Sequence, residues 1–114
     1  MDLRNLSEEE KLLVFSADPF QMTQFILKNN LRGLEKISIE SIKGMKLLPV
    51  EVVNVLLVYF YGEFATQVYN RNDLKKLYHL WAGQGIRTFE DALLMTDRDI
   101  HAELGYTPPN KGGR

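Results

Sequence analysis

The stretch PVEVVNVLLVYFYGEF, residues 49–64, is the longest apolar-rich run of the chain and decides the fold class. Its valines favour a strand, but the run is about sixteen residues long and contains no internal turn signal, so its length favours a helix. Apolar residues fall on nearly all sides of that helix, which predicts a buried position at the centre of the molecule. Pro49 suits its first turn, and Gly62 is expected near its end.

Two helix starts precede this central segment. Ser7 is followed three residues later by Glu10, which predicts a capping box. Asp18 repeats the pattern, with Pro19 at the first helical position and Gln21 at the third. The second of these helices is expected to run to about residue 28, where two asparagines follow.

A shorter helix is expected between the second helix and the central one. The segment SIES, residues 38–41, favours a helix start at Ser38. That helix would continue toward Lys46, with Gly44 weakening its interior.

After the central helix, Asn72 is expected to cap a helix that begins near Asp73. Four apolar residues of this helix fall at i, i+3, i+4 and i+7 and form one stripe: Leu74, Leu77, Tyr78 and Trp81. Lys75, Lys76 and His79 lie off that stripe. Gly83 and Gly85 are expected to end the helix, with Gly85 in the left-handed conformation.

Two short helices complete the pattern. Thr88 and Asp91 predict a capping box for a helix through Leu93, and the segment TDRD, residues 96–99, predicts another that ends at Gly105. No alternating strands joined by a hairpin turn occur, so we expect an all-α fold. The prediction is a compact bundle of about five to six helices that forms one domain over residues 1–106, with a flexible tail at 107–114.

The amino-acid composition limits the classes of protein to which this chain can belong. The chain has 114 residues with 45% hydrophobic and 25% charged residues, which is typical of one globular domain. The absence of cysteine favours a reducing, cytoplasmic setting. The acidic N-terminus is not a signal peptide, and the apolar run is too short to span a bilayer.

The net charge of −1 conceals an uneven distribution along the chain. Residues 1–27 carry a net charge of −3, residues 28–87 carry nine basic and five acidic groups, and residues 88–114 carry a net −2. A basic middle segment between acidic ends predicts a local positive surface or, alternatively, an ordinary set of solvated helix faces.

Motifs that support catalysis are missing from the sequence. There is no phosphate loop of the Walker type, and GQGIRT at 83–88 follows a helix and so does not fit a dinucleotide fingerprint. His79 and His101 lack ligand spacing, and no nucleophile is paired with a base. We therefore expect no enzyme, no cofactor and no metal site.

The central segment, followed about twenty residues later by LKKLYHLWAGQGIRTFEDAL at 74–93, resembles the C-terminal domain of DnaD/DnaB-type primosome proteins and of related phage replication proteins. The resemblance covers roughly residues 18–95. It rests on the order and spacing of the proline-led apolar helix, the helix that ends in Trp81, the Gly-Ile-x-Thr turn and the acidic-Ala helix.

The resemblance implies a role in the initiation or restart of replication. It implies weak, non-specific binding of single-stranded or duplex DNA, contact with a replicative helicase or initiator protein during helicase loading, and self-association. It also implies indirect membrane association through the full-length protein. The winged-helix domain that usually comes first does not fit in 114 residues, so the chain is either a fragment or a domain that stands alone.

The family's DNA-binding signature places an aromatic, an aliphatic and a tryptophan residue four positions apart. The last two match Leu77 and Trp81, whereas the first position holds Asp73, which repels phosphate and cannot stack on a base. Tyr78 is a candidate substitute. The expected DNA contacts are Arg71, Lys75, Lys76, Leu77, Tyr78, Trp81 and Arg87.

Two other functions remain open at this point. The domain could be a protein–protein adaptor that does not bind DNA, or a small helical domain that shares the pattern by chance. Trp81 itself fits either a place in the core or a contact with nucleic acid.

Overall fold

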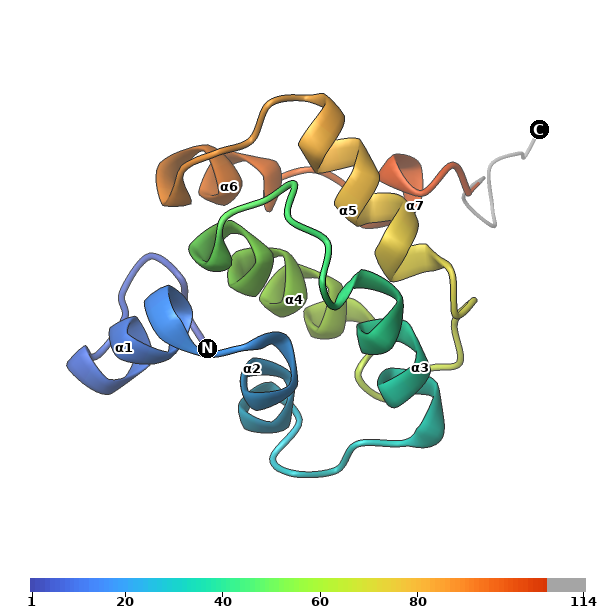
Figure 1. Ribbon diagram of the computed structural model, residues 1–114, viewed down its shortest axis with the longest axis horizontal. Helices are drawn as coiled ribbons and strands as arrows, with labels where there is room; N and C mark the ends of the chain where they lie inside the picture. Colours follow the sequence, from blue (N-terminus) through green and yellow to red (C-terminus); the bar gives the residue numbers. More distant parts are fainter. Residues whose placement is uncertain (107–114) are drawn as a thin grey trace.

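The fold is described by a computed structural model for residues 1–106 and is all-α in that part, as predicted (Figure 1). The predicted tail at 107–114 lies outside the described residues. The seven helices are α1 (Glu8–Ser16), α2 (Pro19–Ile26), α3 (Gly33–Ile42), α4 (Val50–Phe64), α5 (Asp73–Gly83), α6 (Phe89–Met95) and α7 (Ile100–Glu103).

Helix α4 occupies the centre of the bundle, which confirms the prediction from the apolar run. It packs against α1, α2, α5, α6 and α7, while α3 packs on α2 and α5 (Figure 1). Nine of its fifteen residues are buried, on nearly all sides of the helix. Pro49 precedes its first turn and Gly62 lies two residues before its end, as expected.

Side-chain caps start three of the helices where the sequence predicted them. Ser7 and Asp18 each accept a hydrogen bond from the backbone N–H three residues on, and Glu10 and Gln21 reciprocate to close the two capping boxes. The Thr88 hydroxyl accepts from the N–H of Asp91 at the start of α6. Local chemistry therefore sets these three boundaries.

The predicted start of α3 at residue 38 is wrong. The helix begins five residues earlier, and Ser38 is buried in its interior. At the true start the backbone N–H of Arg32 donates to the Glu35 carboxylate at 2.8 Å, a cap made by the third helical residue. Gly44 lies after the helix with φ of 86°, so it ends α3 and does not weaken its interior.

The last predicted helix also starts later than expected. Thr96 is the C-cap residue of α6, and Asp99 is the cap of α7, accepting from the N–H of His101 at 3.1 Å. Gly105 follows α7 with φ of 85°, and Gly85 follows α5 with φ of 75°. The two glycine positions were predicted correctly.

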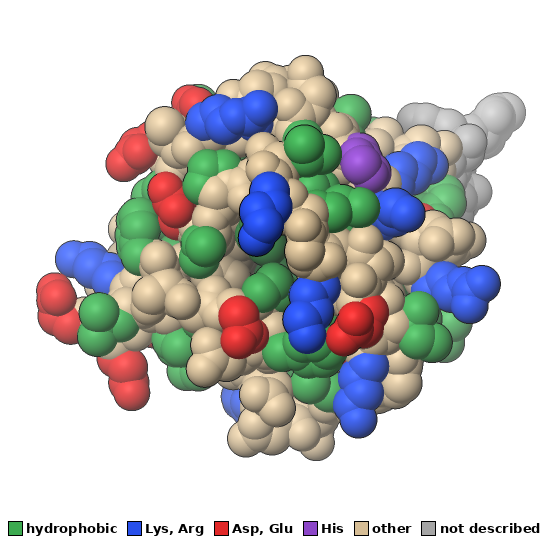
Figure 2. Space-filling model, in the orientation of Figure 1, with side chains coloured by type: hydrophobic (Ala, Val, Ile, Leu, Met, Phe, Trp, Pro, Cys, Tyr) green, Lys and Arg blue, Asp and Glu red, His purple; other side chains and the backbone are tan. Residues whose placement is uncertain are grey.

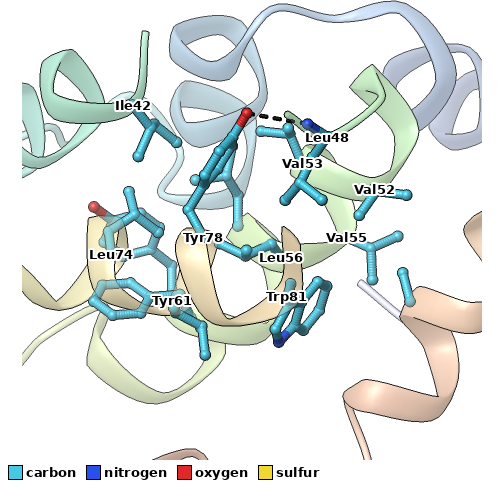
Figure 3. Packing of buried hydrophobic residues seen from close by; sticks show 14 of the residues in the cluster. Ile42, Leu48, Val52, Val53, Val55, Leu56, Tyr61, Leu74, Tyr78 and Trp81 are labelled. Atoms are coloured by element: carbon cyan, nitrogen blue, oxygen red, sulfur yellow. Dashed lines mark hydrogen bonds between the residues drawn. The ribbon is translucent and has the colours of Figure 1, made fainter. Parts of the chain in front are cut away.

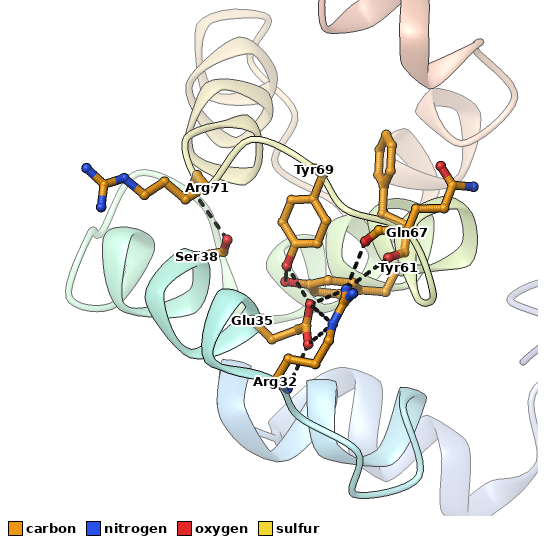
Figure 4. A network of polar contacts seen from close by, with 8 residues as sticks. Arg32, Glu35, Ser38, Tyr61, Gln67, Tyr69 and Arg71 are labelled. Carbon is orange, nitrogen blue, oxygen red and sulfur yellow. Dashed lines mark hydrogen bonds and ion pairs between the residues drawn. The ribbon is translucent and has the colours of Figure 1, made fainter.

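A buried polar network ties α3 to the end of α4 and to the loop before α5 (Figure 4). Arg32 pairs with Glu35 at 2.6 Å and also donates to the carbonyl oxygen of Gln67 at 3.0 Å. The Tyr69 hydroxyl donates to Glu35 and lies 2.8 Å from the hydroxyl of Tyr61. Burial raises the pKa of Tyr69 to about 12. The network fixes the segment that leads into α5.

Asn54, in the middle of α4, joins the corner between α1 and α2 to the core. Its side-chain Nδ2 lies within 3.2 Å of three backbone carbonyl oxygens, those of Leu13, Val14 and Ala17. The Leu13 carbonyl also accepts the N–H of Ala17, whereas carbonyls at the very end of a helix lack a helical partner, so this side chain supplies a donor from outside to those of Val14 and Ala17. The polar residue in the apolar run therefore has a structural role.

Candidate nucleic-acid interface

The inner side of α5 is enclosed in the core. Leu74, Leu77 and Trp81 have no exposed surface and Tyr78 is 1% exposed; Figure 3 shows Leu74, Tyr78 and Trp81 among the core residues. The Trp81 ring lies 5.8 Å from that of Tyr59 on α4. The stripe predicted from the sequence is therefore confirmed. The prediction that Leu77, Tyr78 and Trp81 contact DNA is wrong, because side chains buried between α5 and α4 cannot reach a base.

Tyr78 also holds the loop between α3 and α4. Its hydroxyl oxygen accepts the backbone N–H groups of Leu47 and Leu48, at 3.1 and 3.2 Å (Figure 3). The loop has no helical hydrogen bonds of its own at these positions, so the phenol supplies their acceptor. Tyr78 is thus a core residue that positions the loop.

The outer side of α5 and its approach carry three exposed cations, Arg71, Lys75 and Lys76. Lys76 differs, because its Nζ donates to the backbone carbonyl oxygen of Leu104 at 2.6 Å and lies 5.9 Å from the centre of the Tyr106 ring. Lys76 therefore fastens the end of α7 to α5. Of the three predicted contacts around the start of α5, Arg71 and Lys75 are the two that face solvent without such a bond.

Asp73, which departs from the family's motif, does not face solvent. It is 4% exposed, and both of its carboxylate oxygens lie 2.7 Å from the hydroxyl of Tyr106. The hydrogen bond to this carboxylate raises the pKa of Tyr106. The negative charge is thus directed into a contact between α5 and the end of the described chain, away from any ligand on the outer face of α5.

Arg87 is exposed at the other end of α5, which is roughly 16 Å long at 1.5 Å per residue. There it lines a shallow hollow together with Lys46 and Leu47 of the α3–α4 loop. The predicted cations are therefore not one cluster: Arg71 and Lys75 lie at the start of α5, and Arg87 lies beyond its end.

Cations from neighbouring elements connect these two groups. Lys36 of α3 and Lys43 and Lys46 of the following loop are exposed, and Figure 2 shows Lys and Arg side chains spread over α3, this loop and α5. We call this surface the basic face; its members are Lys36, Lys43, Lys46, Arg71, Lys75 and Arg87. Sequence reasoning counted these lysines in the basic middle segment but did not place them on one surface.

The charges of the basic face are poorly neutralised within the molecule. Among the ion pairs of residues 1–106, Lys43 alone of the six takes part, with Glu40 at 3.9 Å. Acidic side chains are most frequent over α1 and α6 (Figure 2), where Glu8, Glu9 and Glu10 form the first turn of α1. Asp18 and Glu40 are also exposed and lie near Lys43, so the surface charge is uneven but not fully segregated.

The two histidines of the chain lie apart in the structure, on α5 and α7. His79 is exposed, and His101 lies 3.0 Å from the Glu63 carboxylate. No group of three or more His, Cys, Asp or Glu side chains within residues 1–106 is placed to hold a metal ion. None of the helices in this part is both long and apolar enough to cross a membrane.

Comparisons of the chain with protein-family models, with curated proteins and with solved structures found no match.

Proposed function

We propose that the chain is a non-catalytic accessory domain for the initiation or restart of DNA replication, which binds DNA weakly and without sequence preference. The proposal rests on the sequence resemblance to the DnaD/DnaB-type C-terminal domain and on one structural observation. That observation is the basic face, on which five of six exposed cations have no ion-pair partner among residues 1–106.

Contact with DNA through this face is electrostatic. The aromatic side chains of α5 are buried, so base stacking makes no contribution and the cations contact phosphates alone. Each phosphate contact on duplex DNA adds about 0.9 to the slope of log affinity against log salt concentration. Binding is therefore weak, steeply dependent on salt and insensitive to sequence.

The test is fluorescence anisotropy with labelled single-stranded and duplex oligonucleotides over a series of salt concentrations. Lys75→Glu should weaken binding and lower the salt slope by roughly 1 on duplex DNA, because one phosphate contact is lost. Lys11→Glu is the matched control, since it changes the net charge equally at the acidic end of the molecule, on α1. Equal effects of the two variants would show that net charge alone matters, and would overturn the proposal.

In the cell, the domain would contact a replicative helicase or an initiator protein during helicase loading. The alternative function, an adaptor without DNA binding of its own, is favoured by an apolar cavity beside the basic face. A pull-down with replicative helicase and high salt in the wash separates the two functions. Helicase retained by a protein that shows no anisotropy change with DNA would support the adaptor.

A further inference from the structure

An apolar cavity of about 270 Å³ opens where the α1–α2 corner, the α3–α4 loop and the start of α4 meet. Tyr78, which Figure 3 shows in the core, contributes to its lining. Its apolar lining includes Ala17, Pro19, Ile42, Leu48, Val50 and Val53. Sites for drug-sized ligands measure about 300–1,000 Å³, so this cavity is of a size to take one large side chain.

Cations flank the cavity. Lys43 and Lys46 contribute to its lining, and Lys46 also lines the adjoining hollow with Arg87 and the half-exposed Leu47. The one acidic side chain of the lining, Asp18, is engaged as the cap of α2. A ligand at this place therefore meets an apolar pocket bordered by positive charge.

Asn54 also lines the cavity and is completely buried. Because its Nδ2 serves the three carbonyl oxygens at the end of α1, its Oδ1 is left without a donor among residues 1–106. Buried acceptors are seldom left unpaired. The Oδ1 atom has almost no accessible surface, so Asn54 contributes to the wall of the cavity and not to the binding of a ligand.

We propose that this cavity docks an acidic peptide segment of a partner protein. One aromatic side chain enters the apolar cavity, and carboxylates on either side of it pair with Lys43, Lys46 and Arg87. Charge complementarity favours this occupant, and the apolar walls disfavour a phosphate inside the cavity. The inference does not depend on the proposed DNA binding, which uses exposed cations and needs no cavity.

The probe is a fluorescein-labelled peptide in which one tryptophan is flanked on each side by two aspartates. Its binding to the full chain is followed by fluorescence anisotropy, with saturation expected. Val50→Trp should weaken binding about tenfold or more, because Val50 is half-exposed and lines both the cavity and the hollow, so a larger ring there occupies the mouth. Val68→Trp, at a position that is 88% exposed and outside the cavity lining, is the matched control.

Two further comparisons test separately the cations beside the cavity and the tryptophan of the peptide. Lys46→Glu should weaken peptide binding several-fold, whereas Lys75→Glu, which tests the DNA proposal, should leave it unchanged. A peptide with alanine in place of tryptophan should lose about tenfold or more in affinity. Thermal unfolding and circular dichroism on each variant establish that the fold is retained.

Four results would overturn the inference. The first two are a peptide that does not saturate and an alanine peptide that binds as well as the tryptophan peptide. The third is a loss of oligonucleotide binding in Val50→Trp as large as the loss of peptide binding, which would assign the cavity to nucleic acid. The fourth is concentration-dependent sedimentation that Val50→Trp abolishes, which would assign it to a second copy of the chain.

Discussion

The network around Glu35 and the rim of the cavity both contain cations. They differ in whether these cations are paired within the molecule. In the network, Arg32 bonds to Glu35 and to backbone carbonyls, and the Glu35 side chain has no exposed surface. The rim comprises Lys43 and Lys46 of the cavity lining and Arg87 of the adjoining hollow; Lys43 pairs with Glu40 at 3.9 Å, whereas Lys46 and Arg87 take part in none of the ion pairs of residues 1–106. Charges that are paired inside the molecule stabilise the fold, whereas the rim cations are available to another molecule.

The largest effect on stability is expected for a substitution in the network around Glu35. Arg32→Ala leaves the buried Glu35 carboxylate without its cation and should lower the free energy of unfolding by roughly 2–3 kcal/mol. The value is set below that for a fully buried pair because the Arg32 side chain is 39% exposed. Urea unfolding measures it, with Lys36→Ala on the same helix as the control. A loss no larger than the control's would contradict the structural role of the pair.

The dependence of stability on pH should show a smaller effect, which also comes from the pairing of Arg32 with Glu35. Burial opposes ionisation of Glu35, but hydrogen bonds from Arg32 and Tyr69 and the guanidinium charge outweigh it, so the pKa of Glu35 is lowered from 4.5. A lowered folded-state pKa gives stability that is complete above the unfolded-state pKa and is lost as the pH falls through the folded-state value.

Stability should therefore decline as the pH falls below about 4.5, and Glu35→Gln should remove part of that decline. Urea midpoints at pH 7, 5, 4 and 3 measure it, and Glu40→Gln on the exposed side of α3 controls for the loss of one carboxylate. If Glu35→Gln kept the whole acid dependence of the parent, the ion pair would not be its source.

The smallest change in stability is expected for substitutions on the rim. A small effect there would distinguish the rim from the network. Lys46→Glu and Arg87→Glu should each alter the free energy of unfolding by no more than about 0.5 kcal/mol, because both side chains are exposed and neither takes part in an ion pair of residues 1–106. Thermal unfolding measures this. A loss above 1 kcal/mol in either variant would show that the rim, like the network, serves the fold.

Local patterns in the sequence predicted much of the fold. The length of the apolar run identified α4, and the side-chain caps at Ser7, Asp18 and Thr88 placed the starts of three helices. The start of α3 was missed because Arg32 is an unusual cap residue and glycine follows it, so the boundary depends on the Glu35 side chain.

The candidate site was less predictable, since it depends on contacts between residues far apart in the sequence. The pattern placed Leu77, Tyr78 and Trp81 on one face of a helix but could not decide between a core and a ligand as their partner. Lys76 looked equivalent to Lys75 until its bond to Leu104, twenty-eight residues away, set it apart. The cavity could not be foreseen because four separate segments of the chain form it.

The separation of acidic α1 from the basic face has a consequence for how the molecule meets a polyanion. With a net charge of −1 it is not drawn in from afar, and beyond a screening length of about 8 Å little force acts on it. Within that range its two ends experience opposite forces, which produce a torque. If the chain binds DNA as proposed, this torque favours collisions in which the basic face leads.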